Sequence, residues 1–464
     1  MKYNGLCAII IGILKERGDT VTRIQLSDHF SFSRLFRFTF PSIVMMIFTS
    51  IYGIVDGFFV SNFAGEAAFV AVNFIIPYPL ILGAIGFMFG SGGSALIAKT
   101  LGEQDGKRAN QIFSLIVYTS IISGVAIMIA GLLLLRPVAI FLGATDSLLT
   151  DSLRYGNIIL LAIPAYILQY AFQSLFITAE KPRLALAVTL AAGFANIILD
   201  ALFVGVFSWG IEGAAIATAI SQYIGGVVPV IYFLCPNSSL LCLTSTGPDI
   251  RSLLRICLNG SSELMSNISM PAVSMIYNAQ LLFYAGEGGV AAYGVLMYVC
   301  MIFIAIFIGY TVGIAPIVSY HYGAQNHGEL KSLLSKSCVI IGAFSVLMFL
   351  AGELLGTPFS MLFVGYDAGL LDMTSHAFAI FSFSFLFTGF AIFFSGFFTA
   401  LNDGITSAII SFMRTLVFQV AAVLLLPLIF QLDGIWLSLI VAELMAVVVS
   451  LIFLFIKKNK YKYL

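Results

Sequence analysis

The segment MMIFTSIYGIVDGFFVSN, residues 45–62, is long and apolar enough to cross a lipid bilayer as a helix, except for one carboxylate, Asp56. An ionised carboxylate in hydrocarbon costs at least about 2.5–3.5 kcal/mol. A membrane helix retains such a residue where it meets a partner, an ion or a water-filled cavity. The segment therefore predicts a transmembrane helix, and we expect the function to depend on what meets Asp56.

The composition of the whole chain agrees with a membrane protein. Of its 464 residues, 60% are hydrophobic and only 9% are charged, against about 25% charged residues in an ordinary soluble domain. The apolar runs reach about 20 residues without polar alternation, which predicts helices and not barrel strands. The net charge is zero, so nothing favours a nucleic-acid partner. The six cysteines have no paired spacing, and we interpret them as small apolar residues, not as disulfides or metal ligands.

Twelve apolar segments predict twelve transmembrane helices. They are residues 38–61, 72–98, 112–135, 153–178, 184–206, 212–234, 260–283, 291–319, 337–358, 375–400, 406–430 and 434–456. With the N-terminus inside, 19 of the 22 Lys and Arg residues fall on the cytoplasmic side. The positive-inside rule then predicts a multi-pass plasma-membrane protein with both termini cytoplasmic.

The two halves of the chain repeat each other with a shift of 221 residues. This shift aligns FAGEAAFVAVNF (63–74) with YAGEGGVAAYGV (284–295), and it pairs Gly92 with Gly313 and Gly102 with Gly323. Six spans per repeat give the halves the same orientation, which is typical of two-bundle transporters with a central cavity. The fold class expected is therefore an all-α integral membrane protein of two six-helix bundles. The predicted parts are a cytoplasmic arm (1–37), an N-lobe (38–235), a linker (236–256), a C-lobe (257–456) and a basic tail (457–464).

Two acids in the first half are expected to lie at the same depth in the membrane. A helical rise of about 1.5 Å per residue places Asp56 and Asp200 in the outer half, with Asn196 and Thr218 at or just below their level. Two carboxylates, an amide and a hydroxyl suit a hard cation such as Na⁺, or two acids close enough to share a proton. The alternative is that these groups only hydrogen-bond neighbouring helices.

The repeat favours the functional interpretation of the acidic pair. The positions equivalent to Asp56 and Asp200 are Tyr277 and Ala421, so the pair occurs in one half alone. A requirement of the duplicated scaffold would be expected in both halves. We therefore predict a cation-binding and coupling site at Asp56, Asn196, Asp200 and Thr218, with H⁺ or Na⁺ as the coupling ion and no other cofactor.

Four further residues within the spans receive separate interpretations. Glu263 lies in the inner half of its helix and is either a second protonation or substrate site or a helix–helix hydrogen-bond partner. Glu443 is interpreted as structural. Pro41 is either the point at which the first helix bends or a proline in its first turn. Arg414 is the one Lys or Arg inside a span.

Several segments are similar to a known transporter family. They are IYGIVDGFFVSNFAGEAAFVAVN, GSALIAKTLGEQDGKRA, AEKPRLALAVTLAAGFANIILDALFV and GIAPIVSYHYGAQN. In combination these segments resemble the multidrug and toxic compound extrusion (MATE) family, in its MepA-like branch, over residues 38–456. The resemblance implies a twelve-helix antiporter that exports organic cations in exchange for Na⁺ or H⁺.

The resemblance also implies roles for single residues. The family's N-lobe cation site falls on Asp56, Asn196, Asp200 and Thr218, and its bending proline falls on Pro41. Some members carry a further Glu and Asp in the C-lobe, but the tenth span here holds no acid and Glu263 precedes the family's Glu. A C-lobe sodium site of that kind is not expected.

The preferred hypothesis is therefore a cation-coupled multidrug exporter that works as a monomer on small organic cations. The alternative is a flippase or exporter of a lipid-linked or other amphiphilic metabolite, for which cationic residues in the cavity would be expected. A channel or receptor finds no support in a filter-like motif or an appended domain. No nucleophile, metal or nucleotide motif indicates an enzyme, and no Walker A sequence indicates transport driven by ATP.

Overall fold

The computed structural model describes residues 24–463, and these are mostly helical, with no strand among them. The first half contains α2 (Phe32–Phe59), η1 (Val60–Ala64), α3 (Glu66–Ile75), α4 (Pro77–Gly83), α5 (Ile85–Gly102), α6 (Gly106–Phe141), α7 (Asp146–Leu161), α8 (Ile163–Thr178), α9 (Pro182–Asp200), η2 (Ala201–Val206) and α10 (Gly210–Leu234). The second half contains α11 (Ile250–Gly323), α12 (His327–Val364), α13 (Ala368–Phe381), η3 (Ser382–Ser384), α14 (Phe385–Ala400), α15 (Gly404–Phe412), η4 (Met413–Phe418), α16 (Gln419–Leu425), α17 (Pro427–Phe430) and α18 (Leu432–Tyr461). Most of the predicted arm, residues 1–23, lies outside the described residues.

The described helices confirm an all-α membrane protein. Ten of them are long and apolar enough to span a bilayer, and α7 with α8, which meet at 55°, add an eleventh broken span. The 74-residue α11 leaves helical geometry at Gly286, where φ is 65° and ψ is −157°. Glycine adopts such angles without steric cost, so the chain reverses there within a single residue. Counted as two spans, α11 brings the described part of the chain to the twelve that the sequence predicts.

Three expectations from the sequence are corrected. The loop expected between residues 283 and 291 is reduced to the turn at Gly286. The linker ends earlier than residue 256, because Asp249 caps α11 by accepting a hydrogen bond from the Ser252 N–H, and the helix starts at Ile250. Cys235 is disulfide-bonded, so the interpretation of the cysteines is wrong for that residue, whereas the other four in the described part are free.

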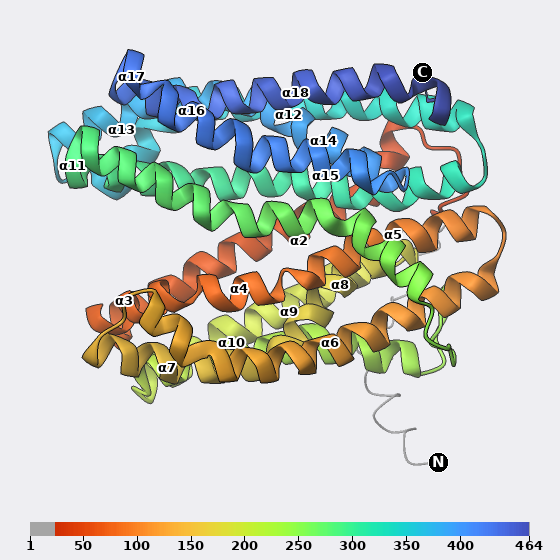
Figure 1. Cartoon of the computed structure of the whole chain (residues 1–464), viewed down its shortest axis with the longest axis horizontal. Coiled ribbons are helices and arrows are strands. Elements are labelled where there is room, and N and C mark those ends of the chain that lie inside the picture. The colour runs from red at the N-terminus through yellow and green to blue at the C-terminus, as the bar shows by residue number, and fades with distance from the viewer. Residues whose placement is uncertain (1–23, 464) are drawn as a thin grey trace.

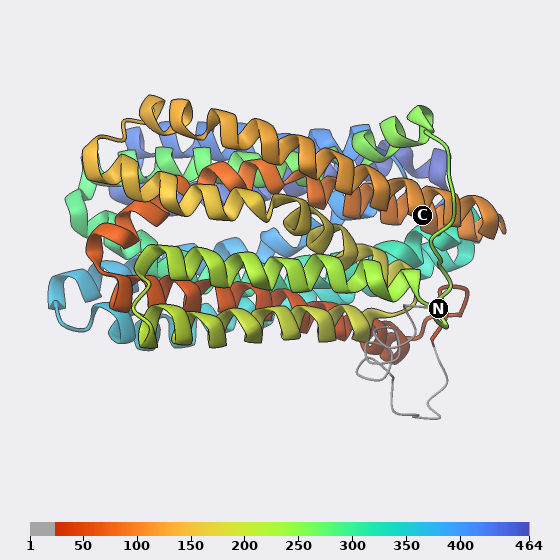
Figure 2. The same ribbon diagram turned by 90° about the horizontal axis from the view of Figure 1, so that it is seen from below.

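The two halves form two bodies that meet at one end of the molecule. In Figure 1 the first half, red to yellow-green, lies below the second half, green to blue, and the halves converge towards the C-terminus. Figure 2 shows the loop between α10 and α11 at that same end. We call this the linker end. Each half has its own apolar core, one built mainly from α3–α10 and the other mainly from α11–α18.

The first helix of each half starts against the opposite half. Leu35, Phe38 and Ile43 of α2 belong to the core of the second half, whereas Met45, further along the helix, belongs to the core of the first half. Conversely, Ile256 of α11 belongs to the core of the first half. The two halves therefore exchange the initial turns of α2 and α11.

Backbone-to-backbone contacts join the halves along α5 and α11. A Cβ added to Gly102 would lie 2.1 Å from the Tyr320 carbonyl oxygen, and one added to Gly323 would lie 2.0 Å from the Lys99 carbonyl oxygen. These two contacts are equivalent under the 221-residue shift. The same tight approach recurs where a Cβ would lie 2.0–2.6 Å from the opposite backbone, at Gly92, Gly260 and Gly309. We call these five residues the glycine seam, which reaches from the linker end towards the middle of the protein.

Candidate functional site

The two intramembrane acids of the first half each precede a π-helical segment. Asp56 lies in the last turn of α2, before η1, and Asp200 is the final residue of α9, before η2. Such π-turns inside helices are frequent at functional sites, because the extra residue per turn frees backbone groups and redirects side chains. The two helices lie side by side, which brings the ends that carry the acids together.

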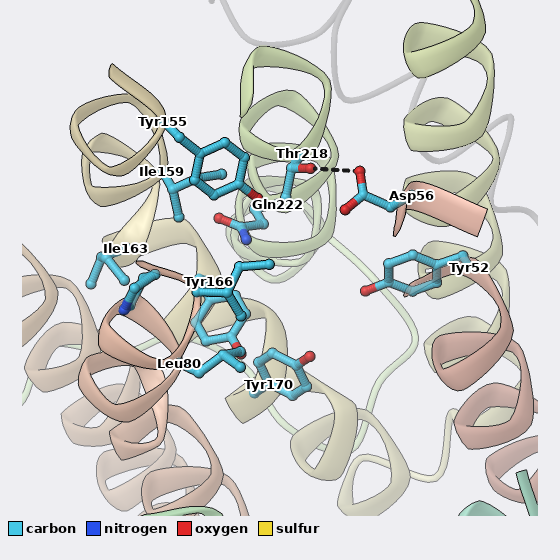
Figure 3. A pocket seen from close by; sticks show the side chains of 12 residues that line it. Tyr52, Asp56, Leu80, Tyr155, Ile159, Ile163, Tyr166, Tyr170, Thr218 and Gln222 are labelled. Atoms are coloured by element: carbon cyan, nitrogen blue, oxygen red, sulfur yellow. Dashed lines mark hydrogen bonds between the residues drawn. The ribbon is translucent and has the colours of Figure 1, made fainter. Parts of the chain in front are cut away.

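The structure brings all four predicted cation-site residues together. The Asn196 amide donates to the Thr218 hydroxyl at 3.5 Å, and this hydroxyl donates to Asp56 Oδ1, also at 3.5 Å (Figure 3). Asp200 has no exposed surface and neighbours the Asp56 carboxyl group. Their role as a cation site stays a prediction.

The chemistry of this cluster fits a small cation or a proton. Within residues 24–463, no donor other than the Asp56 carboxyl group is placed to hydrogen-bond the Asp200 carboxyl group, and buried acceptors without a donor are costly. Two neighbouring carboxylates repel each other when both are ionised, so a proton shared between them or a bound cation relieves that repulsion. Na⁺ would find carboxylate, amide and hydroxyl oxygens here, which are the donors that hard cations prefer.

A pocket of about 630 Å³, partly open to solvent, adjoins the acids in the first half. Figure 3 shows Asp56 and Tyr52 on one side of it and Tyr155, Tyr166 and Tyr170 on the other. The remaining lining residues are Ile76, Pro79, Leu80, Ile159, Ile163, Thr218 and Gln222. Only Asp56 and Thr218 of this set were singled out from the sequence. Two patterns in the sequence point to the tyrosines. Tyr166 and Tyr170 are four residues apart and share one helix face, and Tyr52 lies one turn before Asp56.

Two further predicted residues lie outside this cluster. Glu263 is half-buried on α11 in the second half, within electrostatic range of Arg414. Pro41 is the tenth residue of α2. It is therefore not a first-turn proline, and α2 continues through it without a break. Its role in bending the helix stays a prediction.

Comparison with known proteins identifies the family. A family model described as MatE matches residues 41–202 and again residues 264–425. The chain belongs to the MATE family. The two matched ranges begin 223 residues apart, close to the shift that aligns the halves.

Relatives and solved structures of MATE proteins agree with this assignment. The chain is 25% identical over 436 residues to "Multidrug export protein MepA" of Staphylococcus saprophyticus, covering 92% of this chain and 94% of the relative. It is 24% identical over 431 residues to the protein of the same name from Staphylococcus aureus (strain MRSA252), with the same coverage. A crystal structure of MATE in complex with MaL6 superposes with a TM-score of 0.90 at 21% identity, covering 96% of this chain and 100% of that one. A structure titled as the outward-facing conformation of a multidrug resistance MATE family transporter has a TM-score of 0.89, with the same identity and coverage.

The second half of this MATE protein holds a buried ion pair. The Arg414 Nε donates to both carboxylate oxygens of Glu443, at 3.1 and 2.8 Å. The Glu443 side chain is 1% exposed and that of Arg414 is 14% exposed. Arg414 lies in η4, so α15 and α18 are joined through a π-helical segment. The pair agrees with a structural role for Glu443, and it also neutralises the one cationic side chain that the sequence places inside a span.

Replacing Glu443 by glutamine is expected to destabilise the protein by about 3–5 kcal/mol, because it removes the carboxylate that is hydrogen-bonded to the buried Arg414 guanidinium. The measurement is thermal unfolding in detergent. The double variant Glu443→Leu with Arg414→Leu should recover most of the loss, since it removes both members of the ion pair. As a control, Glu212→Gln removes the acid of an exposed pair with Arg154 at 3.9 Å and should change stability by less than about 1 kcal/mol. Equal stability of Glu443→Gln and Glu212→Gln would contradict the prediction.

Proposed function

We propose that this chain is a secondary active exporter of organic cations that exchanges them for H⁺ or Na⁺ by alternating access. The observation that carries the proposal is the buried Asp200, whose carboxyl group meets the Asp56 carboxyl group and receives no hydrogen bond from any other donor in the described part of the chain. Such a pair costs free energy until a positive charge joins it. The names of the curated relatives, "Multidrug export protein MepA", support export as the direction.

The pocket supports an organic cation as the substrate. Tyrosine rings attract cations through their π-faces, and four tyrosines line this pocket next to one carboxylate. Apolar lining residues, including Ile159 and Leu80, favour flat amphiphilic molecules over strongly hydrated ones.

The position of Asp56 supports antiport. This residue lines the pocket and also accepts the hydrogen bond from Thr218 in the acidic cluster. A proton or Na⁺ bound between Asp56 and Asp200 cancels the charge that would hold an organic cation, so the two ligands exclude each other. This exclusion couples the export of one cation to the entry of the other, provided that the protein changes its open end only when the carboxylate pair is occupied.

The orientation belongs to the same proposal. The linker end carries the basic tail and the loops rich in Lys and Arg, so we place it, with both termini, in the cytoplasm. The chain contains both halves, and we propose that a monomer in the plasma membrane suffices for transport.

Transport in proteoliposomes tests the proposal directly. The purified protein is reconstituted, and movement of ethidium is followed while either a Na⁺ gradient or a pH gradient is imposed, each without the other. One gradient is expected to drive ethidium against its own concentration difference, and adding ATP should change nothing. If neither gradient drives uptake in vesicles that contain folded protein, the antiporter proposal fails.

The alternative, export of a lipid-linked anionic metabolite, is less well supported. It would need cationic side chains free to meet the anion, yet Arg414 is held by Glu443. The pocket that adjoins the acids carries a carboxylate and no Lys or Arg among its lining residues.

A further inference from the structure

A short segment precedes the first helix of each half at the linker end. Each segment contacts the start of a helix in the opposite half. We call residues 24–31, before α2, strap 1, and residues 239–249, before α11, strap 2. Neither strap contains a helix or a strand. Their contacts to α6 and α12 are made by specific side chains.

Strap 1 fastens the start of α2 to α12 of the second half. Glu329, in the first turn of α12, accepts the Phe30 N–H at 3.0 Å and lies 2.6 Å from His29 Nδ1. The Lys336 ammonium donates to the Phe30 carbonyl oxygen. Phe30 has no exposed surface and Glu329 is only 6% exposed, so this attachment is packed as well as hydrogen-bonded.

The same strap also reaches the first half. The Leu26 N–H donates to Glu180 Oε1 at 2.8 Å, in the turn between α8 and α9. The Leu26 side chain is 1% exposed and shares an apolar core with Ile177 of α8 and with residues of the second half. Strap 1 therefore joins Glu180 in one half to Glu329 in the other.

Strap 2 fastens the start of α11 to α6 of the first half. Asn110 and Ser114 of α6 accept the N–H groups of Cys242 and Thr244 at 3.0 and 2.8 Å. At the end of the strap, the Arg108 guanidinium donates to the Asp249 carboxylate, with which it forms an ion pair.

The Arg108 guanidinium also donates to the Ser252 hydroxyl at 3.1 Å. Hydrogen bonds from the Ser252 hydroxyl and N–H, together with Arg108, hold the pKa of Asp249 at about 2. The Asp249 carboxylate therefore stays ionised at every physiological pH.

The two anchoring side chains occupy equivalent positions under the 221-residue shift, since Glu329 at the start of α12 corresponds to Arg108 at the start of α6. Their contacts differ: Asp249 binds Arg108, whereas Glu329 binds His29 and Phe30, next to the equivalent Asp28. Each strap thus binds the first turn of the same helix of the opposite repeat. The anchoring side chains have opposite charge, so neither strap matches the anchor of the other.

We propose that the two straps are crossed clips that hold the linker end closed, and that Glu329 and Arg108 set how readily this end opens during transport. Alternating access requires the halves to separate at each end in turn. Opening the linker end would pull α12 from the strap that precedes α2, and α6 from the strap that precedes α11. Strap 1, bound to Glu180 and Glu329, would lose one attachment. This inference rests on the proposed function for its role in transport, but the clips themselves can be tested without transport.

The test is a distance measurement across the linker end. Spin labels are placed at Lys107 and Gly328, two exposed and repeat-equivalent positions on α6 and α12, in a variant without other reactive cysteines. Electron–electron resonance then reports the distance distribution in nanodiscs. Glu329→Ala and Arg108→Ala are each expected to raise the long-distance population severalfold, and the double variant more. Lys331→Ala, an exposed neighbour on α12, is the matched control and should leave the distribution unchanged.

A charge swap distinguishes opening of the linker end from misfolding of a variant. Arg108→Asp alone should open the linker end, and Arg108→Asp combined with Asp249→Arg should close it again to the parental distance distribution. Unchanged distributions in Glu329→Ala and Arg108→Ala, or an open state that the swap does not reverse, would overturn the proposal. Because no substrate or gradient is used, this outcome is independent of whether ethidium transport is found.

Discussion

Replacing Asp56 by asparagine is expected to reduce ethidium efflux from cells at least tenfold, to the level of cells without the protein. The amide keeps the shape of the side chain and its acceptor for Thr218, but it removes the charge that both the organic cation and the coupling ion need. Efflux is measured as the loss of ethidium fluorescence after loading, at matched protein levels in the membrane. Asp372→Asn, on an exposed face of α13, is the control and should transport normally.

Replacing the second acid, Asp200, is expected to separate the loss of gradient-driven transport from the loss of ethidium binding. Asp200 neighbours Asp56 but is not among the pocket-lining residues. Asp200→Asn should therefore retain ethidium binding to the purified protein, within about threefold of the parental Kd, while losing gradient-driven transport. Asp56→Asn should lose both. Efflux above half the parental rate in Asp56→Asn would contradict the assignment of this residue, whatever the result for Asp200→Asn.

Adding a single methyl group at Gly102 is expected to abolish transport as completely as removing the charge of Asp56. A Cβ there would lie 2.1 Å from the Tyr320 carbonyl oxygen, a separation that neither backbone can relieve by moving a side chain. In Gly102→Ala the halves cannot meet at the linker end, so the protein should accumulate with this end open. Gly323→Ala, the repeat equivalent, should behave in the same way because its Cβ would lie 2.0 Å from the Lys99 carbonyl oxygen.

The measurement combines ethidium efflux with the linker-end distances used for the straps. A loss of more than tenfold in efflux is expected, together with a shift to longer distances. Gly106→Ala is the matched control, four residues away and with no atom within 4 Å of the added Cβ. Parental efflux in Gly102→Ala would show that the close approach at the seam is not needed for the transport cycle.

Sequence reasoning anticipated the parts of the molecule that depend on position along a helix. The cost of a buried charge singled out Asp56 and Asp200, and the constant helical rise placed them at one depth, next to Asn196 and Thr218. The repeat shift places Gly102 and Gly323 at equivalent positions, and in the structure each lies against the backbone of the opposite half. Both the depth of a residue in the membrane and the register of the repeat can be calculated from residue numbers alone.

The features that were missed depend on how the helices are rotated and crossed. Arg414 and Glu443 lie on different helices, and only the packing of η4 against α18 shows that they face each other. The tyrosine pocket is lined from both sides of the 55° bend between α7 and α8, by Tyr155 before it and by Tyr166 and Tyr170 after it. The straps look like ordinary polar linker sequence, because their partners on α6 and α12 are far away in the chain. Rotation and crossing angles come from side-chain packing over whole helices, which no local pattern encodes.

The glycine seam lets the two halves close until backbone atoms meet backbone atoms. Side chains also cross it: the Lys99 ammonium lies over the Tyr322 ring, and the Gln104 amide donates to the Tyr320 hydroxyl. Parting the halves therefore breaks these contacts together with the backbone fit. The seam resists leakage because the two backbones fit closely. Most of the free energy that selects the closed state then comes from contacts that a bound cation or a strap can alter.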